Sequence, residues 1–195
     1  SKGLAYEGWT YDYPTEAEWE YACRAGSRAG YPSAIKDLGK HGNFADRTLY
    51  DDRELVHYVY ACREADDGYG RVFAPVGQYL PNPWGIHDML GNLAELCSTY
   101  YLDKLTAGTD PNFQSLPAPR GSRHRVSRGG SWCSTPEYLH VAFRNAFTGT
   151  QTPHIGMRLV LRQGEGLTRT RTEISNALQA KLDAEKKARE KEKKK

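Results

Sequence analysis

Two carboxylates stand seven residues apart in the segment Asp88-Met89-Leu90-Gly91-Asn92-Leu93-Ala94-Glu95. A glycine turn between them can direct backbone carbonyl oxygens toward a common point. Calcium binds about six to eight oxygen ligands, taken from carboxylates, amide side chains and backbone carbonyls. The segment can therefore wrap one cation. Asp and Gly are also common in ordinary turns, and spacing alone favours that simpler interpretation.

The four cysteines are the residues that could bind a soft metal or form disulfides: Cys23, Cys62, Cys97 and Cys133. They are widely spaced and form no C-x-x-C pair, so we expect no structural zinc site. Their even number leaves disulfides open and does not fix the compartment. His87 and His154 lack a partner at metal-ligand spacing and are expected to be structural. Ser131 is not flanked by the pattern of a nucleophile elbow.

Charge is distributed unevenly along the chain of 195 residues, whose net charge is +3. Residues 181–195 contain eight Lys and Arg against four Asp and Glu, which leaves about −1 for the remainder. A domain without a basic surplus attracts nucleic acid weakly, so we expect no nucleic-acid partner. No apolar run approaches the ~20 residues of a membrane-spanning helix, and we expect no membrane span.

Local signals predict one clear helix near the beginning of the chain. Thr15 and Glu18 form a capping box, and Gly26 suits the position after a helix end, so the helix is expected between them. Residues 27–80 show no long hydrophobic period and are expected to be mostly irregular. So long an irregular stretch needs an explanation, and bound metal ions are one.

Short strands are expected later in the chain, around residues 125–132, 139–147 and 156–161. In the last of these, apolar and polar residues alternate, which predicts a half-buried strand with Met157, Leu159 and Leu161 on one face. We expect Trp19, Trp84 and Trp132 in the core. Beyond residue 163 the composition changes, and an apolar stripe of helical spacing precedes a charged run. We therefore predict a domain at 1–163 and a charged, helical tail at 164–195, with Ile174, Leu178 and Leu182 on the stripe.

Three separated segments are together similar to one protein family. They are PTEAEWEYA at 14–22, APVG at 74–77 with PNPWGIHDMLGN at 81–92, and RGGSW at 128–132 with FRN at 143–145 and IGMR at 155–158. Because their order and spacing also agree, the chain resembles the formylglycine-generating enzymes, or sulfatase-modifying factors. The resemblance implies an α+β, loop-rich, C-type-lectin-like fold with a surface groove. The N-terminal part of the family domain is missing, so we expect an upstream segment or domain.

The resemblance also implies two calcium sites, each with two side chains and two backbone carbonyls. One would use the side chains of Asp88 and Glu95 and the carbonyls of Gly91 and Leu93. The other would use the side chains of Asn43 and Asp67 and the carbonyls of Phe44 and Tyr69. Arg144 and Arg158 stand where the family has arginine, and we expect them to tie loops together by hydrogen bonds.

The enzymes of this family oxidise a sulfatase cysteine with copper(I) held by two thiolates. Soft thiolates suit Cu(I), and the family places the pair just after Gly-Gly-Ser, five residues apart. Cys133 lies near the first position, whereas Tyr138 or Leu139 stands near the second. Copper(I) is therefore not expected, and Cys133 is a catalytic candidate only if Cys97 or His140 completes the site.

The leading hypothesis is a calcium-stabilised binding or accessory module without formylglycine-generating activity, whose groove receives a peptide or a small molecule. A copper-dependent oxidase that converts a sulfatase cysteine to formylglycine is the first alternative. An iron-dependent sulfoxide synthase is the second, but the iron ligands of those enzymes are histidines of a separate helical domain that this sequence lacks.

Overall fold

The computed structural model describes residues 9–50, 62–70, 72–102, 124–149 and 152–163. They belong to two units, one of residues 12–160 and one that includes residues 9–11 and 161–163. The smaller unit is built on β1 (Trp9–Asp12), which pairs with β6 (Val160–Gln163) in a two-stranded sheet. The tail at 164–195 that we predict to be helical lies outside the described residues.

The predicted helix is present as α1 (Glu16–Arg24), and its capping box is confirmed. The Thr15 hydroxyl accepts from the Glu18 amide at 3.2 Å, and the Glu18 carboxylate accepts from the Thr15 amide at 2.7 Å. These bonds satisfy donors that a helix start leaves open. The helix ends at Ala25, which is left-handed at φ 44°, and Gly26 follows.

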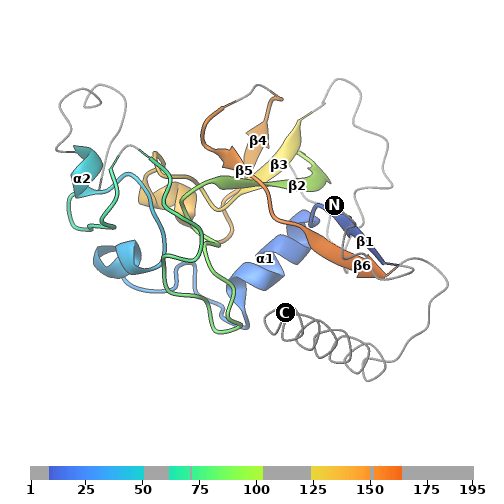
Figure 1. The fold of residues 1–195 in the computed structure, drawn as a ribbon, viewed down its shortest axis with the longest axis horizontal. Coiled ribbons are helices and arrows are strands. Elements are labelled where there is room, and N and C mark those ends of the chain that lie inside the picture. Colours follow the sequence, from blue (N-terminus) through green and yellow to red (C-terminus); the bar gives the residue numbers. More distant parts are fainter. Residues whose placement is uncertain (1–8, 51–61, 71, 103–123, 150–151, 164–195) are drawn as a thin grey trace, which may run out of the picture. The chain divides into compact units, whose positions relative to one another are not determined.

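Four strands of the larger unit form a sheet with the order β4-β3-β2-β5. The strands are β2 (Ala94–Tyr100), β3 (Arg125–Arg128), β4 (Asn145–Phe147) and β5 (Ile155–Gly156). β3 runs antiparallel to both of its neighbours, while β5 runs parallel to β2. Helix α1 packs against β2 and β3 (Figure 1). The register places Glu95 opposite Arg128, so charged side chains enter the layer between sheet and helix.

Little of the remaining described chain is regular, as the sequence predicts for residues 27–80. It forms three short helices, η1 (Ile35–Lys40), α2 (Arg47–Tyr50) and η2 (Pro136–Leu139). The described residues thus combine few helices with short strands, which confirms the α+β class.

Two expectations about buried side chains are wrong. Met157, Leu159 and Leu161 are 65%, 51% and 37% exposed. The reason is that Arg158 turns inward to contact Glu95, and its chain neighbours therefore point outward. Trp84 is 48% exposed at the tip of a turn, where its ring meets Tyr21 edge-on at 4.9 Å between centroids.

The core of the larger unit joins α1, the sheet and the irregular loops. Its most buried apolar members are Trp19, Leu38, Phe44, Cys97, Val126 and Leu139. Arg128 is fully buried among them, pairs with Glu16 and Glu20, and donates to the Val141 and Ala142 carbonyls. Such pairing is required, because an unpaired buried charge is strongly destabilising.

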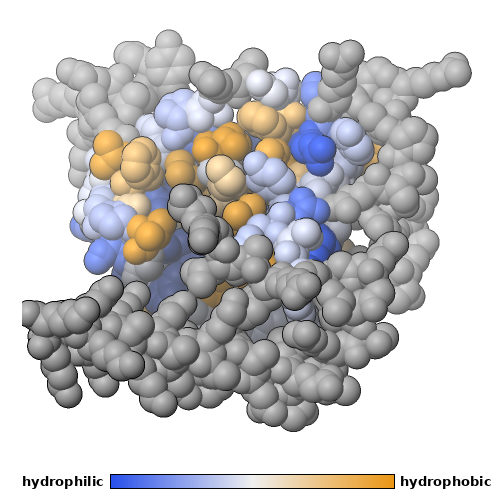
Figure 2. All heavy atoms as spheres, turned by 45° about the vertical axis from the view of Figure 1, so that its right-hand side comes forward, coloured by the Kyte–Doolittle hydropathy of each residue, from blue (hydrophilic) through white to orange (hydrophobic). Residues whose placement is uncertain are grey.

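The surface carries apolar side chains among polar ones. On the face in Figure 2, orange hydrophobic groups lie between blue hydrophilic ones. In the part of the chain that the structure describes, no helix has the length and apolar character needed to cross a bilayer.

Candidate functional site

The two predicted calcium loops meet at a pair of glycines. A β-carbon added to Gly42 would lie 2.0 Å from the Leu90 carbonyl oxygen, and one added to Gly91 would lie 2.1 Å from that of Asn43. Only glycine permits so close an approach of two backbones. The Asn92 amide then donates to the Asn43 carbonyl at 2.7 Å. The structure therefore brings the two sets of predicted ligands next to each other.

Asn43, a predicted side-chain ligand, is completely buried. Its amide nitrogen donates to the Val72 carbonyl at 2.8 Å. Its Oδ1 is buried without a hydrogen-bond partner in the described part of the chain. A buried amide oxygen without a donor costs free energy, and a cation would satisfy it. This observation fits a calcium ion in the loop.

Asp67 is the carboxylate of the same loop. Its two oxygens accept from the backbone amides of Phe44 and Tyr69, both at 2.8 Å. Burial raises the pKa of Asp67 to about 7, against the lowering effect of these two amides, and the charges of Asp46 and Asp66 raise it further. No Lys or Arg among the described residues forms an ion pair with it. A cation facing this carboxylate would favour its ionised form.

Phe44 and Tyr69 are the two predicted carbonyl ligands of this loop. Their backbone amides donate to the Asp67 carboxylate, which keeps both residues beside it. The Tyr69 carbonyl already accepts from the Thr48 hydroxyl at 2.6 Å. A carbonyl oxygen has two lone pairs, so this bond does not prevent it from binding a metal as well.

Asp46 is a member of this cluster that sequence reasoning missed. It is fully buried, and it caps α2 by accepting from the amides of Thr48 and Leu49. Its Oδ2 accepts from the Asp67 amide at 2.6 Å. Aspartate directly before a short helix is an N-cap signal, which could have identified it. Asp46 thus positions Asp67 but has its own oxygens occupied.

The second predicted loop contains Asp88 and Glu95. Asp88 is left-handed at φ 56°, and one of its carboxylate oxygens accepts from the Gly77 amide. Its Oδ1 is buried and has no hydrogen-bond partner within the described residues, as for Asn43. The predicted carbonyl ligands Gly91 and Leu93 follow in the same loop. On the side of Asp88, the loop fits a cation.

Glu95 does not fit a calcium site in the same way. Its Oε2 accepts from Trp19 Nε1 at 2.7 Å and from Arg158 Nε at 2.9 Å, and its Oε1 accepts from Arg158 Nη2 at 2.9 Å. Arg158 Nη2 also lies 2.9 Å from the His87 carbonyl oxygen. The expectation that Arg144 and Arg158 tie loops together is confirmed, since Arg144 binds Glu16 and the Leu102 carbonyl.

The copper position of the family's enzymes would use sulfur ligands, unlike the two calcium loops. Cys133 is partly buried, with its Sγ 3.4 Å from the Ser131 hydroxyl. Tyr138, near the second thiolate position, is 46% exposed and lies on Phe143 with 4.7 Å between ring centroids. Leu139 is fully buried in the core. The local chain therefore offers one thiol where the family's enzymes have two.

The other groups considered for copper are engaged elsewhere. Cys23 and Cys97 are free thiols in the core, and burial raises the pKa of each to about 12. His140 packs edge-on against Tyr31 at 5.2 Å, and its Nδ1 accepts from the Ala142 amide. In the described residues, no three His, Cys, Asp or Glu side chains gather into a metal-binding group. Any calcium in the two loops would therefore need amide and backbone oxygens in addition to a carboxylate.

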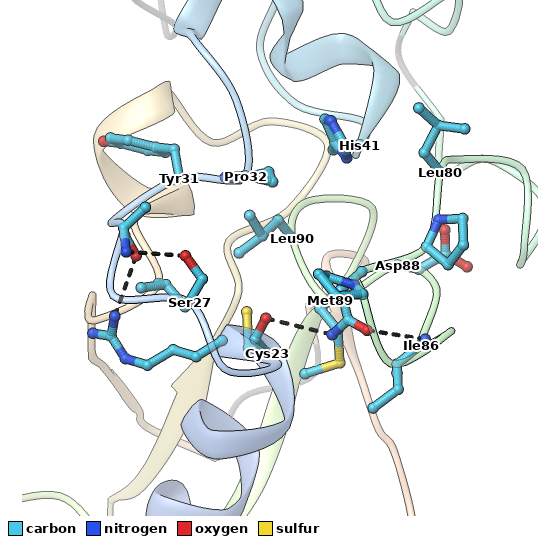
Figure 3. A pocket seen from close by; sticks show the side chains of 16 residues that line it. Cys23, Ser27, Tyr31, Pro32, His41, Leu80, Ile86, Asp88, Met89 and Leu90 are labelled. Atoms are coloured by element: carbon cyan, nitrogen blue, oxygen red, sulfur yellow. Dashed lines mark hydrogen bonds between the residues drawn. The ribbon is translucent and has the colours of Figure 1, made fainter.

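A pocket of about 380 Å³ opens between the end of α1, the loop that follows it and the turn at 81–86 (Figure 3). His41 and Leu80 lie on one side of it, Cys23 and Met89 on the other, and Leu90 between them. Burial lowers the pKa of His41, and the charge of Lys40 lowers it further. The lining is mainly apolar and includes Tyr31, Pro32, Ile86 and Val141.

Comparison with known proteins identifies the family from most of the sequence. The family described as "Sulfatase-modifying factor enzyme 1-like domain" matches residues 1–163. The chain belongs to this family. A formylglycine-generating enzyme of Mycobacterium tuberculosis is 32% identical over 169 residues, which cover 80% of this chain and 53% of the relative. The chain spans about half the length of the three bacterial formylglycine-generating enzymes that it matches, at 53%, 51% and 45% of each.

Other family members carry different names. Serine/threonine-protein kinase pkn1 of Chlamydia pneumoniae is 31% identical over 135 residues, covering 68% of this chain and 18% of the kinase. Among solved structures, Treponema denticola variable protein 1 matches with a TM-score of 0.58 at 26% identity, over 78% of this chain and 48% of that one. PvdO from Pseudomonas aeruginosa matches with a TM-score of 0.56 at 25% identity, over 78% and 52%. The family fold is therefore shared by proteins with several different names.

Proposed function

We propose that this member of the sulfatase-modifying factor family is a calcium-stabilised ligand-binding module that does not generate formylglycine. The observation that carries the proposal is the side chain at the second thiolate position. Tyr138 there is exposed and its ring contacts that of Phe143 at a tilt of 55°, and Leu139 is buried in the core. A linear copper(I) site needs two thiolates, and Cys133 supplies one.

Thiol chemistry further supports this proposal. A thiolate, not a thiol, binds a soft metal. The burial that raises the pKa of Cys97 to about 12 keeps it protonated, and its side chain is fully enclosed in the core. Recruiting Cys97 to Cys133 would require the core around β2 to open. We expect iodoacetamide at pH 8 to modify Cys133 in the folded chain and to leave Cys23 and Cys97 unmodified until urea unfolds it.

Copper(I) titration and an activity assay test the proposal together. The full chain is titrated with copper(I) against a chelating competitor and incubated with a peptide that carries a sulfatase cysteine motif. We expect no tight stoichiometric complex, no formylglycine by mass spectrometry, and the same result for Cys133→Ser. A tight complex and a product that both disappear in Cys133→Ser would establish the copper-dependent oxidase instead.

Ligand binding is proposed for the pocket in Figure 3. Its volume of about 380 Å³ lies within the range of about 300–1,000 Å³ that small-molecule sites occupy. The lining is mainly apolar, so the pocket suits an uncharged small molecule with an aromatic or aliphatic body. Of the two ligands expected from the sequence, a peptide or a small molecule, we therefore propose the small molecule.

A neutral naphthalene dye, N-phenyl-1-naphthylamine, is a suitable probe of this pocket. We expect the fluorescence of the dye to rise on binding. Ala29 lines the pocket, and we expect Ala29→Phe to fill part of its volume and to weaken dye binding at least tenfold. Ala34 is an exposed alanine outside the lining, so Ala34→Phe is the matched control. Equal binding by both variants would remove the pocket from the proposal, and competition by unrelated peptides would favour a peptide ligand.

Calcium stabilisation is proposed first for the loop that contains Asn43 and Asp67. It is supported by the buried Asn43 oxygen without a donor and by an Asp67 carboxylate without a cation in the described residues. Bound there, calcium would supply charge and coordination that hold the irregular segments 43–46 and 66–69 together. The proposed role is structural, and no reaction step depends on the ion.

A further inference from the structure

We infer that the guanidinium of Arg158 takes the place of the second calcium ion, so that the chain binds one calcium rather than the two that the family resemblance implies. The inference depends on the proposed calcium stabilisation only for the first ion, at Asn43 and Asp67. For the loop of Asp88 and Glu95 the inference does not depend on calcium stabilisation, because the cation there is the guanidinium of Arg158.

The contacts of Arg158 are those expected of a cation at this loop. It binds both oxygens of Glu95 at 2.9 Å and reaches the carbonyl oxygens of His87 at 2.9 Å and Asp88 at 3.4 Å. One carboxylate and two backbone carbonyls are also typical calcium ligands. The guanidinium therefore already satisfies acceptors of the kind that a metal ion would use.

Charge makes a second cation unfavourable beside this one. Arginine remains protonated at any physiological pH, and the Glu95 side chain that it binds is only 11% exposed. A calcium ion ligated by Glu95 would lie within a few ångströms of the guanidinium, with little water between them. It would have to repel or displace a group that holds its partner in a bidentate pair.

Glu95 also has no oxygen left without a donor. Trp19 Nε1 adds a third hydrogen bond, at 2.7 Å, and this indole is fixed in the core. Rotating Glu95 toward a metal would leave the buried indole nitrogen without an acceptor, which is costly. The fixed indole and the bidentate arginine both hold Glu95 away from the role of calcium ligand.

The loop of Asn43 and Asp67 differs in the partners of its carboxylate. Among the described residues, the Asp67 carboxylate accepts only from backbone amides, whereas the Glu95 carboxylate accepts from an arginine. A buried side-chain oxygen without a donor is common to both loops, as Asn43 Oδ1 in one and Asp88 Oδ1 in the other. Arg47, which lies close in sequence to this loop, pairs with the exposed Asp66. The Asp67 carboxylate thus has no cationic partner among the described residues, and the Glu95 carboxylate is paired with Arg158.

Calcium stoichiometry of the full chain tests the inference. Each protein is treated with EGTA, desalted and titrated with calcium by isothermal titration calorimetry. We expect one ion for the wild type and one for Glu95→Gln, because Glu95 is not a ligand. Arg158→Gln releases the Glu95 carboxylate, and we expect it to bind two ions and to gain a larger calcium-dependent rise in Tm than the wild type.

The outcomes separate this inference from the proposed function. Two ions in the wild type, with one lost in Glu95→Gln, would overturn the inference and leave calcium stabilisation intact. No ion in the wild type would end the proposed calcium stabilisation, and the inference would then stand or fall on whether Arg158→Gln gains one. A folded Arg158→Gln that gains none would overturn it. If Arg158→Gln does not fold, the Glu95→Gln stoichiometry decides.

Discussion

Two adjacent loops of this molecule carry the same kind of sequence signature and reach opposite electrostatic states. The loop of Asn43 and Asp67 buries a carboxylate and an amide oxygen with no Lys or Arg paired to them among the described residues. In the loop of Asp88 and Glu95, the glutamate is bound on both oxygens by Arg158. Oxygen donors at the correct spacing are therefore insufficient to identify a calcium site, because a side chain remote in sequence decides whether a charge is left to bind.

The difference arises from topology. Arg158 follows β5, and β5 pairs in parallel with β2, in which Glu95 lies. That pairing delivers the guanidinium to the start of β2, whereas the described chain beside Asp67 supplies acidic neighbours, Asp46 and Asp66. The fold itself supplies a cation to Glu95, whereas for Asp67 we propose an ion from solution.

The largest effect is expected at Gly91, which belongs to the loop of Asp88 and Glu95 and lies against Asn43 of the other loop. Gly91→Ala places a β-carbon 2.1 Å from the Asn43 carbonyl oxygen at a residue with φ +71°. We expect a loss of about 3 kcal/mol or more in the free energy of unfolding, since a backbone clash must move both loops. Urea denaturation measures it.

Gly77→Ala is the matched control for this substitution. Gly77 has a similar φ of +78° but nothing within 4 Å of an added β-carbon, so it isolates the backbone strain of about 1 kcal/mol. Equal losses in the free energy of unfolding would show that Gly91 does not lie in tight contact with Asn43. The two loops could then not be compared as neighbours.

Chelation should have the next largest effect, through one loop only. At calcium one hundred times above its Kd, binding stabilises the fold by about 2.7 kcal/mol. For a chain of this size we expect EGTA to lower Tm by roughly 5–10 °C, at about 2–4 °C per kcal/mol. Differential scanning calorimetry would measure the shift.

Two isosteric variants divide that effect between the loops. Asp67→Asn should abolish the EGTA shift because it removes the charge that faces the ion. Asp88→Asn should leave it unchanged, because the cation of that loop is Arg158. A shift abolished by Asp88→Asn would mean that calcium binds the second loop after all, and the contrast between the loops would disappear.

Local chemistry explains which parts of the fold could be predicted from sequence. The capping box of Thr15 and Glu18 lies within one turn, so the helix is confirmed nearly to its ends. The alternation at 157–161 led to the wrong face because Arg158 has an inward partner at Glu95, 63 positions away. No local pattern contains that information.

The candidate site shows the same division between local and distant information. The resemblance selected Asn43 and Asp88, and each has a buried oxygen without a donor in the described residues. It also selected Glu95 as a ligand without revealing that Trp19 and Arg158 occupy both of its oxygens. The sequence indicates which oxygens could bind a metal. Whether a side chain of the protein already occupies them depends on contacts between segments that are distant in sequence.

The smallest expected effect compares one arginine beside each loop. Arg158→Lys keeps the charge but loses the fork that binds Glu95 on both oxygens and the His87 carbonyl, so we expect a loss of about 1 kcal/mol in urea unfolding. Arg47→Lys is the control, because its pair with Asp66 is exposed at 56% and 46%, and exposed pairs contribute about 0–1 kcal/mol. If both changes cost the same, the geometry of the guanidinium is unimportant and only its charge matters. A clear excess for Arg158→Lys would show that this loop is built around the shape of an arginine, which a spherical calcium ion cannot reproduce.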